Sequence, residues 1–382
     1  MARLGEICKF QSGGTPSKGE ASYFNGNIPW ITTVALNGKS INEKSAVDWI
    51  TEKAIEKSAA KIVPANSVMV GTRVGVGKVA INEIAMSTSQ DIISLIEIDE
   101  NKWSKSFICK FIQGKGSYLN SQARGATIKG IKIETLAGLQ LPDITLEEQN
   151  RVADVLDIVE NLISLRKEQL AKLDELVKAR FVEMFGDSLH NRNTVSLEEI
   201  SDFVTVGIAN SATHAYADSG IVMLRNQNIK ENYLDDNDLI YITPDFSKKY
   251  GSKQLAENDI LVIRTGYPGV ACLVPKKYEG CQTFTTLIVR LKNSTPAHTN
   301  YVCHYINSSF GKGYVEQSKV GVAQQNFGAK ALAKMPIAVP PMELQEQFAA
   351  FVEQTNKTKL TIQASLDKLE VMKKALMQEY FG

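Results

Sequence analysis

The stretch "GSYLNSQARGATIKGIKIETLAGLQLPDITLEEQ", residues 116–149, decides the fold because a similar stretch follows later in the chain. It recurs as "KGYVEQSKVGVAQQNFGAKALAKMPIAVPPMELQEQ", residues 312–347, with Tyr118 and Tyr314 separated by 196 positions. A repeat of this length is far longer than the roughly 20 to 50 residues of solenoid repeats. The pattern therefore predicts a duplicated domain.

The end of the repeat predicts a small change of register. Leu136 and Leu332 still match at a separation of 196 residues. The pairs Glu148-Gln149 and Glu346-Gln347 match at 198 instead. We therefore expect a two-residue insertion near the prolines of the second copy.

Composition sets broad limits on the protein. The 382 residues are 43% hydrophobic and 22% charged, with a net charge of +1, which is typical of a soluble protein of about two or three domains. No apolar run is long enough to span a membrane, and no apolar core of a signal peptide follows the N-terminus. The five cysteines are scattered without a CxxC pair, and the four histidines show no ligand spacing. We expect a cytoplasmic protein with free thiols and no metal site.

Each half of the chain begins with a globular part, residues 1–143 and 188–342. Short β-rich runs such as "SVMVGTRV", "KVAINEI" and "DILVIRT" predict strands. "WSKSFICKFIQ" and "NYVCHYINSSF" carry apolar residues at helical spacing and predict helices. The predicted fold class is α+β.

The glycine-rich stretch "MVGTRVGVGKVAIN", residues 69–82, raises the question of a nucleotide site. A P-loop requires four residues between its outer glycines and a Ser or Thr after its lysine. Here five residues separate Gly71 from Gly77, and Val79 follows Lys78. We interpret the stretch as a tight turn between two strands.

A long helix is predicted after each globular part, over residues 144–187 and 343–382. No Pro or Gly interrupts residues 144–185 or 342–381, and apolar residues fall on heptads in both helices. This pattern favours an antiparallel coiled coil with the two domains at its ends, related by a pseudo-twofold axis. The alternative is two amphipathic helices, each lying on its own domain. The residues assigned to the coiled coil are Leu156, Ile163, Leu170, Leu173, Val177, Val352, Ile362, Leu366, Leu369 and Leu376.

The ordered combination of these features resembles the specificity (S) subunits of type I restriction–modification enzymes over essentially the whole chain. The resemblance rests on the start "LGEICKFQSGGTPSKG…NIPWITT", the turn "GTRVGVGKVAIN" and the exit "LPDITLEEQNRVADVLD". It also rests on the later echo "PPMELQEQFAAFVEQ". No single piece is specific, but the order of domain, helix, domain, helix is.

The resemblance implies a DNA-recognition protein without catalytic activity. Each globular part would be a target recognition domain that reads one half of a split DNA target, and the paired helices would set the unread spacer. Because the two domains differ in sequence, the target would be asymmetric. Two methyltransferase (M) subunits would bring S-adenosylmethionine, and restriction (R) subunits would bring ATP and Mg. No cofactor would bind this chain, and no membrane is involved.

Candidate DNA contacts are polar or basic residues near glycine-rich turns, because Lys and Arg bind phosphates and forked or amide side chains read base edges. The amide clusters "RNQN" and "AQQN" suit adenine edges best. In the first domain the candidates are Ser12, Thr15, Ser17, Lys18, Arg73, Lys78, Ser89, Gln90, Arg124, Thr127 and Lys129. In the second they are Arg225, Asn226, Gln227, Asn228, Arg264, Tyr267, Gln324, Gln325 and Asn326.

Further expectations concern individual residues and the class of protein. We expect Arg264 to be the counterpart of Arg73, and Phe185 and Phe381 to contact the methyltransferase or else to cap the helices on their own domains. A coiled-coil tethering protein without a DNA role remains an alternative. A self-contained methyltransferase or nuclease is disfavoured, because no "NPPY" or "DPPY" tetrapeptide occurs in the sequence.

Overall fold

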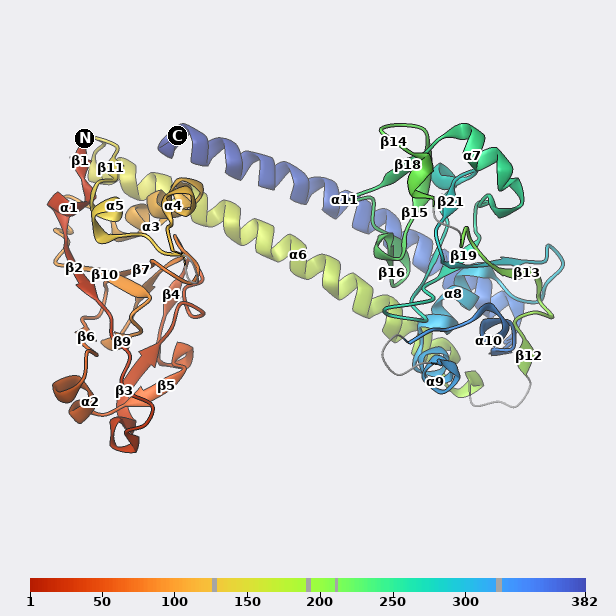
Figure 1. The fold of residues 1–382 in the computed structure, drawn as a ribbon, viewed down its shortest axis with the longest axis horizontal. Coiled ribbons are helices and arrows are strands. Elements are labelled where there is room, and N and C mark those ends of the chain that lie inside the picture. Colours follow the sequence, from red (N-terminus) through yellow and green to blue (C-terminus); the bar gives the residue numbers. More distant parts are fainter. Residues whose placement is uncertain (126–128, 190–193, 210–211, 321–324) are drawn as a thin grey trace. The chain divides into compact units, whose positions relative to one another are not determined.

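The computed structural model describes residues 1–382 except 126–128, 190–193, 210–211 and 321–324. The chain forms two compact units (Figure 1). Unit 1 consists of Met1–Lys167 and Ala364–Gly382, and unit 2 consists of Glu168–Gln363. Each unit therefore contains parts of both long helices.

Unit 1 contains two larger sheets and a short pair of strands. One sheet has the order β2 (Lys9–Ser12), β10 (Ile92–Ile96), β7 (Val68–Gly71), β8 (Val79–Asn82), β4 (Ser40–Ile41). The other has the order β5 (Asp48–Ile50), β3 (Phe24–Ile31), β9 (Met86–Thr88), β6 (Ile62–Val63). β1 (Ala2–Arg3) pairs with β11 (Gln140–Leu141). The short helices are α1 (Leu4–Ile7), α2 (Glu52–Lys57), α3 (Lys105–Gly114), α4 (Gly116–Gln122) and α5 (Ile133–Ala137).

Unit 2 repeats this plan. One sheet has the order β13 (Ser201–Val206), β22 (Leu287–Leu291), β19 (Ile260–Val262), β20 (Ala271–Leu273). Another has the order β14 (Tyr216–Ala217), β18 (Ile240–Ile242), β15 (Ile221–Leu224), β21 (Gln282–Thr283). Short pairs are β12 (Thr194–Ser196) with β23 (Pro336–Ala338) and β16 (Ile229–Lys230) with β17 (Tyr233–Leu234). The short helices are α7 (Pro244–Lys249), α8 (Thr299–Asn307), α9 (Ser309–Ser318) and α10 (Ala329–Ala333). The matching plan confirms the α+β class and the duplicated domain.

The long helices are α6 (Leu146–Leu189) and α11 (Met342–Phe381), and they run antiparallel within each unit. In unit 1, Glu160 pairs with Lys373 and Lys167 pairs with Glu370, each at 2.8 Å. In unit 2, Asp174 pairs with Lys359, and the rings of Phe181 and Phe348 lie 5.3 Å apart. Because residue numbers rise along one helix as they fall along the other, both sets of contacts confirm the antiparallel pairing.

The heptad positions predicted from the sequence face inward. All ten predicted seam residues are buried or half-buried, and the deepest are Leu156, Val177, Val352 and Leu366. Large apolar residues of α11 that lie off the seam, such as Leu360 and Val371, are exposed. The apolar seam is therefore the packed side of each helix.

A buried glutamine fixes the start of each long helix and corrects the predicted register. The side chain of Gln149 accepts a hydrogen bond from the Ser104 backbone N–H at 2.9 Å and donates to the Lys102 carbonyl at 3.1 Å. Gln345 makes the equivalent bonds to His298 and Pro296, at 2.8 and 3.0 Å. Gln149 therefore corresponds to Gln345 rather than to Gln347, and the expected two-residue insertion is wrong.

The aromatic residues at the helix ends belong to the domain cores. Phe185 is fully buried and packs against Tyr301 in unit 2, with ring centroids 4.8 Å apart. Phe381 packs against Phe107 and Phe111 in unit 1, at 5.3 and 5.8 Å. Of the two alternatives for Phe185 and Phe381, the structure supports capping of the helices on their own domains, because both side chains are buried there.

Candidate nucleic-acid interface

The glycine-rich stretch of unit 1 forms the turn between β7 and β8, which pair antiparallel. The Gly71 N–H donates to the Lys78 carbonyl at 2.8 Å, and the Gly77 N–H donates to the Gly71 carbonyl at 3.0 Å. Gly75 and Gly77 have φ angles of 71° and 81°, a left-handed backbone that suits glycine. This geometry confirms the predicted turn between strands.

The turn of unit 2 is built in the same way between β19 and β20. Ile263 N–H donates to the Val270 carbonyl at 2.8 Å, and Gly269 N–H donates to the Ile263 carbonyl at 2.9 Å. These bonds place Ile263 at the position of Gly71, so Arg264 corresponds to Thr72 and Thr265 corresponds to Arg73. The expectation that Arg264 is the counterpart of Arg73 is therefore wrong by one residue.

Three distant segments of unit 2 meet at this turn. Arg264 Nε donates to Asn326 Oδ1 at 3.0 Å, and the Phe327 N–H donates to the Arg264 carbonyl at 2.9 Å. Asn226 Nδ2 donates to the carbonyl oxygen of Thr265 at 3.2 Å. The structure therefore brings together the predicted candidates Asn226, Arg264 and Asn326.

Fewer of the predicted DNA-contact residues around this turn are accessible than the sequence suggested. Gln227 and Gln325 are exposed, and Tyr267 at the tip of the turn is 83% exposed. Arg264 is half-buried, and its Nε donates to Asn326. An arginine and two amide side chains thus lie on rigidly braced segments, which is the chemistry that reads base edges.

The amide cluster "RNQN" is largely structural. Asn228 is fully buried, and its Nδ2 donates to the carbonyls of Asp235 at 3.0 Å and Asn237 at 2.8 Å. Its Oδ1 accepts the backbone N–H of Arg225 at 3.0 Å. The prediction that Asn228 contacts DNA is wrong, because every polar atom of its side chain is used inside the domain. Asn226 is also engaged, since its Oδ1 accepts from the Thr286 hydroxyl at 3.1 Å.

Sequence reasoning missed the residues that brace this turn. Thr265 and Thr286 hold Asn226 in place, and Asp238 accepts a hydrogen bond from the Arg225 guanidinium. A threonine beside a turn glycine is too common a pattern to have identified them. These residues hold the segments that carry the accessible side chains, and their own hydrogen-bonding groups are used in doing so.

The polar loop after β2 in unit 1 exposes four of the predicted residues. Ser12, Thr15, Ser17 and Lys18 are all exposed. Close packing holds the loop against β9: Gly14 N–H donates to the Thr88 carbonyl at 2.8 Å, and a Cβ on Gly13 would lie 2.2 Å from the Ser89 carbonyl oxygen. These glycines allow the close approach of the two backbones.

The same approach buries Ser89. Its side chain is enclosed beneath the loop, whereas the neighbouring Gln90 is exposed. The prediction that Ser89 contacts DNA is wrong, because the loop covers it. Gln90 stays a candidate.

Basic side chains surround the turn of unit 1. Arg73 lies 3.9 Å from Asp91, and a Cβ on Gly130 would lie 2.9 Å from Arg73 Cγ. Gly130 forms a backbone bridge with Arg124. The structure thus brings the backbones of the segments around Arg73, Gln90 and Arg124 together. Lys78 and Lys129 are exposed, while Thr127 and Gln324 lie outside the described residues.

The described residues also bear on membrane and metal binding. Within the described ranges, no helix has the length and apolar character needed to cross a membrane. The described side chains also include no group of three or more His, Cys, Asp or Glu arranged to hold a metal ion.

Comparison with known proteins identifies relatives of the whole arrangement. The sequence matches the family described as "Type I restriction modification DNA specificity domain" over residues 1–175 and 191–371. The EcoR124I/EcoR124II specificity subunit of Escherichia coli is 32% identical over 193 residues, which are 49% of this chain and 46% of that protein. The MjaIX specificity subunit of Methanocaldococcus jannaschii is 28% identical over 188 residues, 49% of this chain and 44% of that protein. The alignments thus span about half of this chain and slightly less than half of these relatives.

Solved structures share the fold over the full length. The type I S subunit of M. genitalium superposes with a TM-score of 0.57 at 13% identity, covering 100% of this chain and 95% of that one. A chain from a structure of the type I restriction–modification system, described in terms of complex assembly and conformational transition, gives 0.61 at 16% identity and covers 100% and 96%. At such identities the likeness concerns the fold. Because the family match extends over both halves, the chain belongs to the type I restriction–modification DNA specificity family.

Proposed function

We propose that this chain is the DNA-recognition subunit of a type I restriction–modification complex, in which each globular domain reads one half of a bipartite, asymmetric target. The observation that carries the proposal is the meeting of three braced segments in unit 2, where Gln227, Gln325 and Arg264 surround the turn. Hydrogen bonds hold the backbone of these segments before binding, so less backbone entropy is lost on binding, which favours specific contacts.

The two classes of contact would be divided among the exposed residues. Lysines and arginines such as Lys18, Lys78 and Arg124 would bind phosphates, which supplies affinity without sequence preference. The exposed amides Gln90, Gln227 and Gln325 would read base edges. A net charge of only +1 is modest for a DNA-binding chain, so specific contacts would matter more than bulk electrostatics.

The chemistry would be carried by other subunits. Two methyltransferase subunits would supply S-adenosylmethionine, and restriction subunits would supply ATP and Mg for cleavage. This chain would itself be non-catalytic and would act in the cytoplasm. Its long helices would set the spacer between the half-sites and dock the methyltransferases.

Substitution of the turn arginines is expected to affect one half-site each. Arg73→Ala should weaken recognition only of the half-site read by the first domain, and Arg264→Ala only of the other. Loss of a base-edge contact costs about 1–3 kcal/mol of discrimination at one position, whereas loss of a phosphate contact weakens all sequences alike. The measurement is binding of the assembled complex to duplexes varied one half-site at a time, at two salt concentrations.

The same experiment separates DNA recognition from tethering. A coiled-coil tether without a DNA role would give no salt-dependent binding in any variant. An effect of Arg73→Ala on the second half-site would contradict the division of labour between the domains.

An exposed apolar face of α6 is our candidate for methyltransferase docking. Ile158, Leu162 and Leu165 are 59%, 39% and 54% exposed and are spaced to lie on one side of the helix. Leu162→Glu with Leu165→Glu should reduce co-purification with the methyltransferase at least tenfold while leaving the thermal midpoint unchanged, because several apolar contacts are replaced by charge. Ser164→Glu, an exposed position outside this face, is the matched control. Normal assembly of the double variant would exclude this face.

A further inference from the structure

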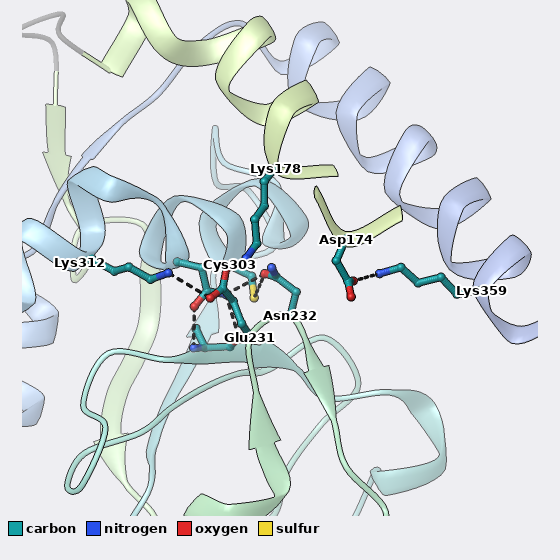
Figure 2. A network of polar contacts seen from close by, with 9 residues as sticks. Asp174, Lys178, Glu231, Asn232, Cys303, Lys312 and Lys359 are labelled. Carbon is teal, nitrogen blue, oxygen red and sulfur yellow. Dashed lines mark hydrogen bonds and ion pairs between the residues drawn. The ribbon is translucent and has the colours of Figure 1, made fainter. Parts of the chain in front are cut away.

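The tip of the β16–β17 hairpin in unit 2 carries a carboxylate between two lysines (Figure 2). Glu231 Oε1 lies 2.8 Å from Lys178 Nζ on α6, and Glu231 Oε2 lies 3.0 Å from Lys312 Nζ on α9. One carboxylate therefore contacts the long helix and a short helix of the recognition domain at once.

The charge of Glu231 is held in place by these partners. Partial burial would raise the pKa of its carboxyl group, but hydrogen bonds from Lys178 and Lys312 lower the pKa below its usual value. Glu231 is therefore ionised at neutral pH, and both contacts are ionic.

The hairpin and the long helix belong to different apolar clusters. Val177 and Phe181 of α6 pack in a core with Tyr301, whereas Ile229 and Leu234 of the hairpin pack in a separate cluster around Leu261. A pocket of about 310 Å³ lies beside Glu231, lined among others by Lys178, Phe181 and Lys312. At this joint the helix is connected to the hairpin by polar contacts next to open space rather than by close packing.

The joint is connected to both candidate reading segments. Glu231 lies four residues after Gln227 in the sequence. The neighbouring Asn232 N–H donates to the Ala271 carbonyl at 2.8 Å, and Asn232 Oδ1 accepts from Asn307 Nδ2 at 2.7 Å. Ala271 itself begins β20, directly after the turn that carries Tyr267. Movement at the joint would therefore shift both segments together.

Unit 1 has a different residue at the position of Glu231. Gly38 occupies the position of Asn232, since its N–H donates to the Val79 carbonyl at 2.7 Å. The preceding residue, Asn37, therefore occupies the position of Glu231, and its Oδ1 accepts a hydrogen bond from the Lys39 backbone N–H at 3.0 Å. The carboxylate between two lysines is therefore a feature of unit 2 that the matching position of unit 1 does not share.

We infer that Glu231 is a positioning residue that fixes the reading segments of the second recognition domain on helix α6. In this role it sets how strictly the complex discriminates between spacer lengths. The inference rests on the proposed function, because spacing matters only if both domains read DNA. A residue that only stabilised the domain would lower the melting temperature without changing the preference for spacing.

The experiment measures binding of the assembled complex to duplexes with the preferred spacer and with spacers one base pair shorter and longer. Glu231→Gln removes the charge with little change of shape, and Lys178→Met removes the partner on α6. Each should reduce discrimination between spacers by roughly two- to fivefold, the size expected for one partly exposed ion pair. Base preference within each half-site should not change.

Two matched controls separate positioning from stability. Lys312→Met removes an ion pair to the same carboxylate but leaves the link to α6 intact, and Asp174→Asn removes the nearby ion pair with Lys359 that joins the two long helices. Both should retain wild-type discrimination. Equal effects in Lys312→Met and Lys178→Met, or unchanged discrimination in Glu231→Gln, would overturn the inference. If the wild-type complex showed no half-site preference, the proposed function itself would be contradicted.

Discussion

Replacement of Leu366 by aspartate is expected to destabilise unit 1 by roughly 3 kcal/mol or more, because a charge would enter an apolar seam without a partner. Leu366 is 5% exposed and lies on the packed side of α11. The carboxylate cannot reach water without displacing the facing helix. Circular dichroism should show a loss of helical signal, and thermal unfolding should shift by several degrees.

The matched control lies five residues further along the same helix. Val371 is 70% exposed, and aspartate there meets only solvent. Val371→Asp should change stability by no more than about 0.5 kcal/mol, as expected at an exposed surface position. Equal melting temperatures for the two variants would mean that the seam does not hold the helices together.

The elements that could be predicted from the sequence are those specified by local pattern. Heptad spacing identified Leu156 and Leu366 as inward-facing, because helix geometry alone decides which residues share a side. The turn at Gly75 and Gly77 was predictable for a similar reason, since few residues other than glycine adopt a positive φ at low cost. Both inferences need no knowledge of the rest of the chain.

The candidate site was predicted less well, because accessibility depends on contacts between distant segments. Asn228 looked like a base reader beside Gln227, yet carbonyl groups seven and nine residues later take up its amide. Ser89 was predicted to be accessible, but the loop at Gly13 packs over it and buries it. The register of Gln345 was ambiguous for another reason, since "ELQEQ" offers two glutamines and only burial selects one.

A buried lysine in unit 1 is a feature that the sequence pattern concealed. Lys110 on α3 is 2% exposed, and its Nζ lies 2.6 Å from both Asp157 Oδ1 and Glu160 Oε2 on α6. Burial alone would lower its pKa, but the hydrogen bonds to Asp157 and Glu160 raise the pKa above its ordinary value. The ammonium group therefore stays charged and ties the recognition domain to the long helix.

Unit 2 has an uncharged side chain at the position equivalent to Lys110. The bonds of Gln149 to Ser104 and of Gln345 to His298 align α3 with α8, which places His304 where unit 1 has Lys110. Burial lowers the pKa of His304 to about 4, so its ring is neutral at pH 7. It packs against Phe348 with ring centroids 5.0 Å apart. A neutral ring at this position shows that the charge of Lys110 is specific to unit 1.

Lys110→Met is therefore expected to destabilise unit 1 by about 3 kcal/mol at pH 7, because Glu160 would stay buried with one cation fewer. The control Lys105→Met, on the same helix, removes an ion pair to the exposed Glu100 and should cost less than about 1 kcal/mol. Thermal or urea unfolding of the full chain measures both. A similar loss in the two variants would contradict a special role for Lys110.

The pH dependence of this loss provides a second test. In the wild type, burial would raise the pKa of Glu160, but hydrogen bonds from Lys110 and Lys373 lower it, so this group stabilises the fold above its unfolded pKa and loses that contribution on acidification. Without Lys110, the effect of burial on the pKa of Glu160 is offset by one hydrogen bond fewer. As the pH falls, protonation of Glu160 removes its buried charge and so reduces the destabilisation of the variant. The difference in stability between wild type and Lys110→Met should therefore shrink between pH 7 and pH values near the unfolded carboxyl pKa of about 4.3. Glu160→Gln in the Lys110→Met background should remove this trend and recover part of the stability at pH 7, because it removes the unpaired charge itself. A difference that stays constant with pH would show that Lys110 contributes through packing rather than through its charge.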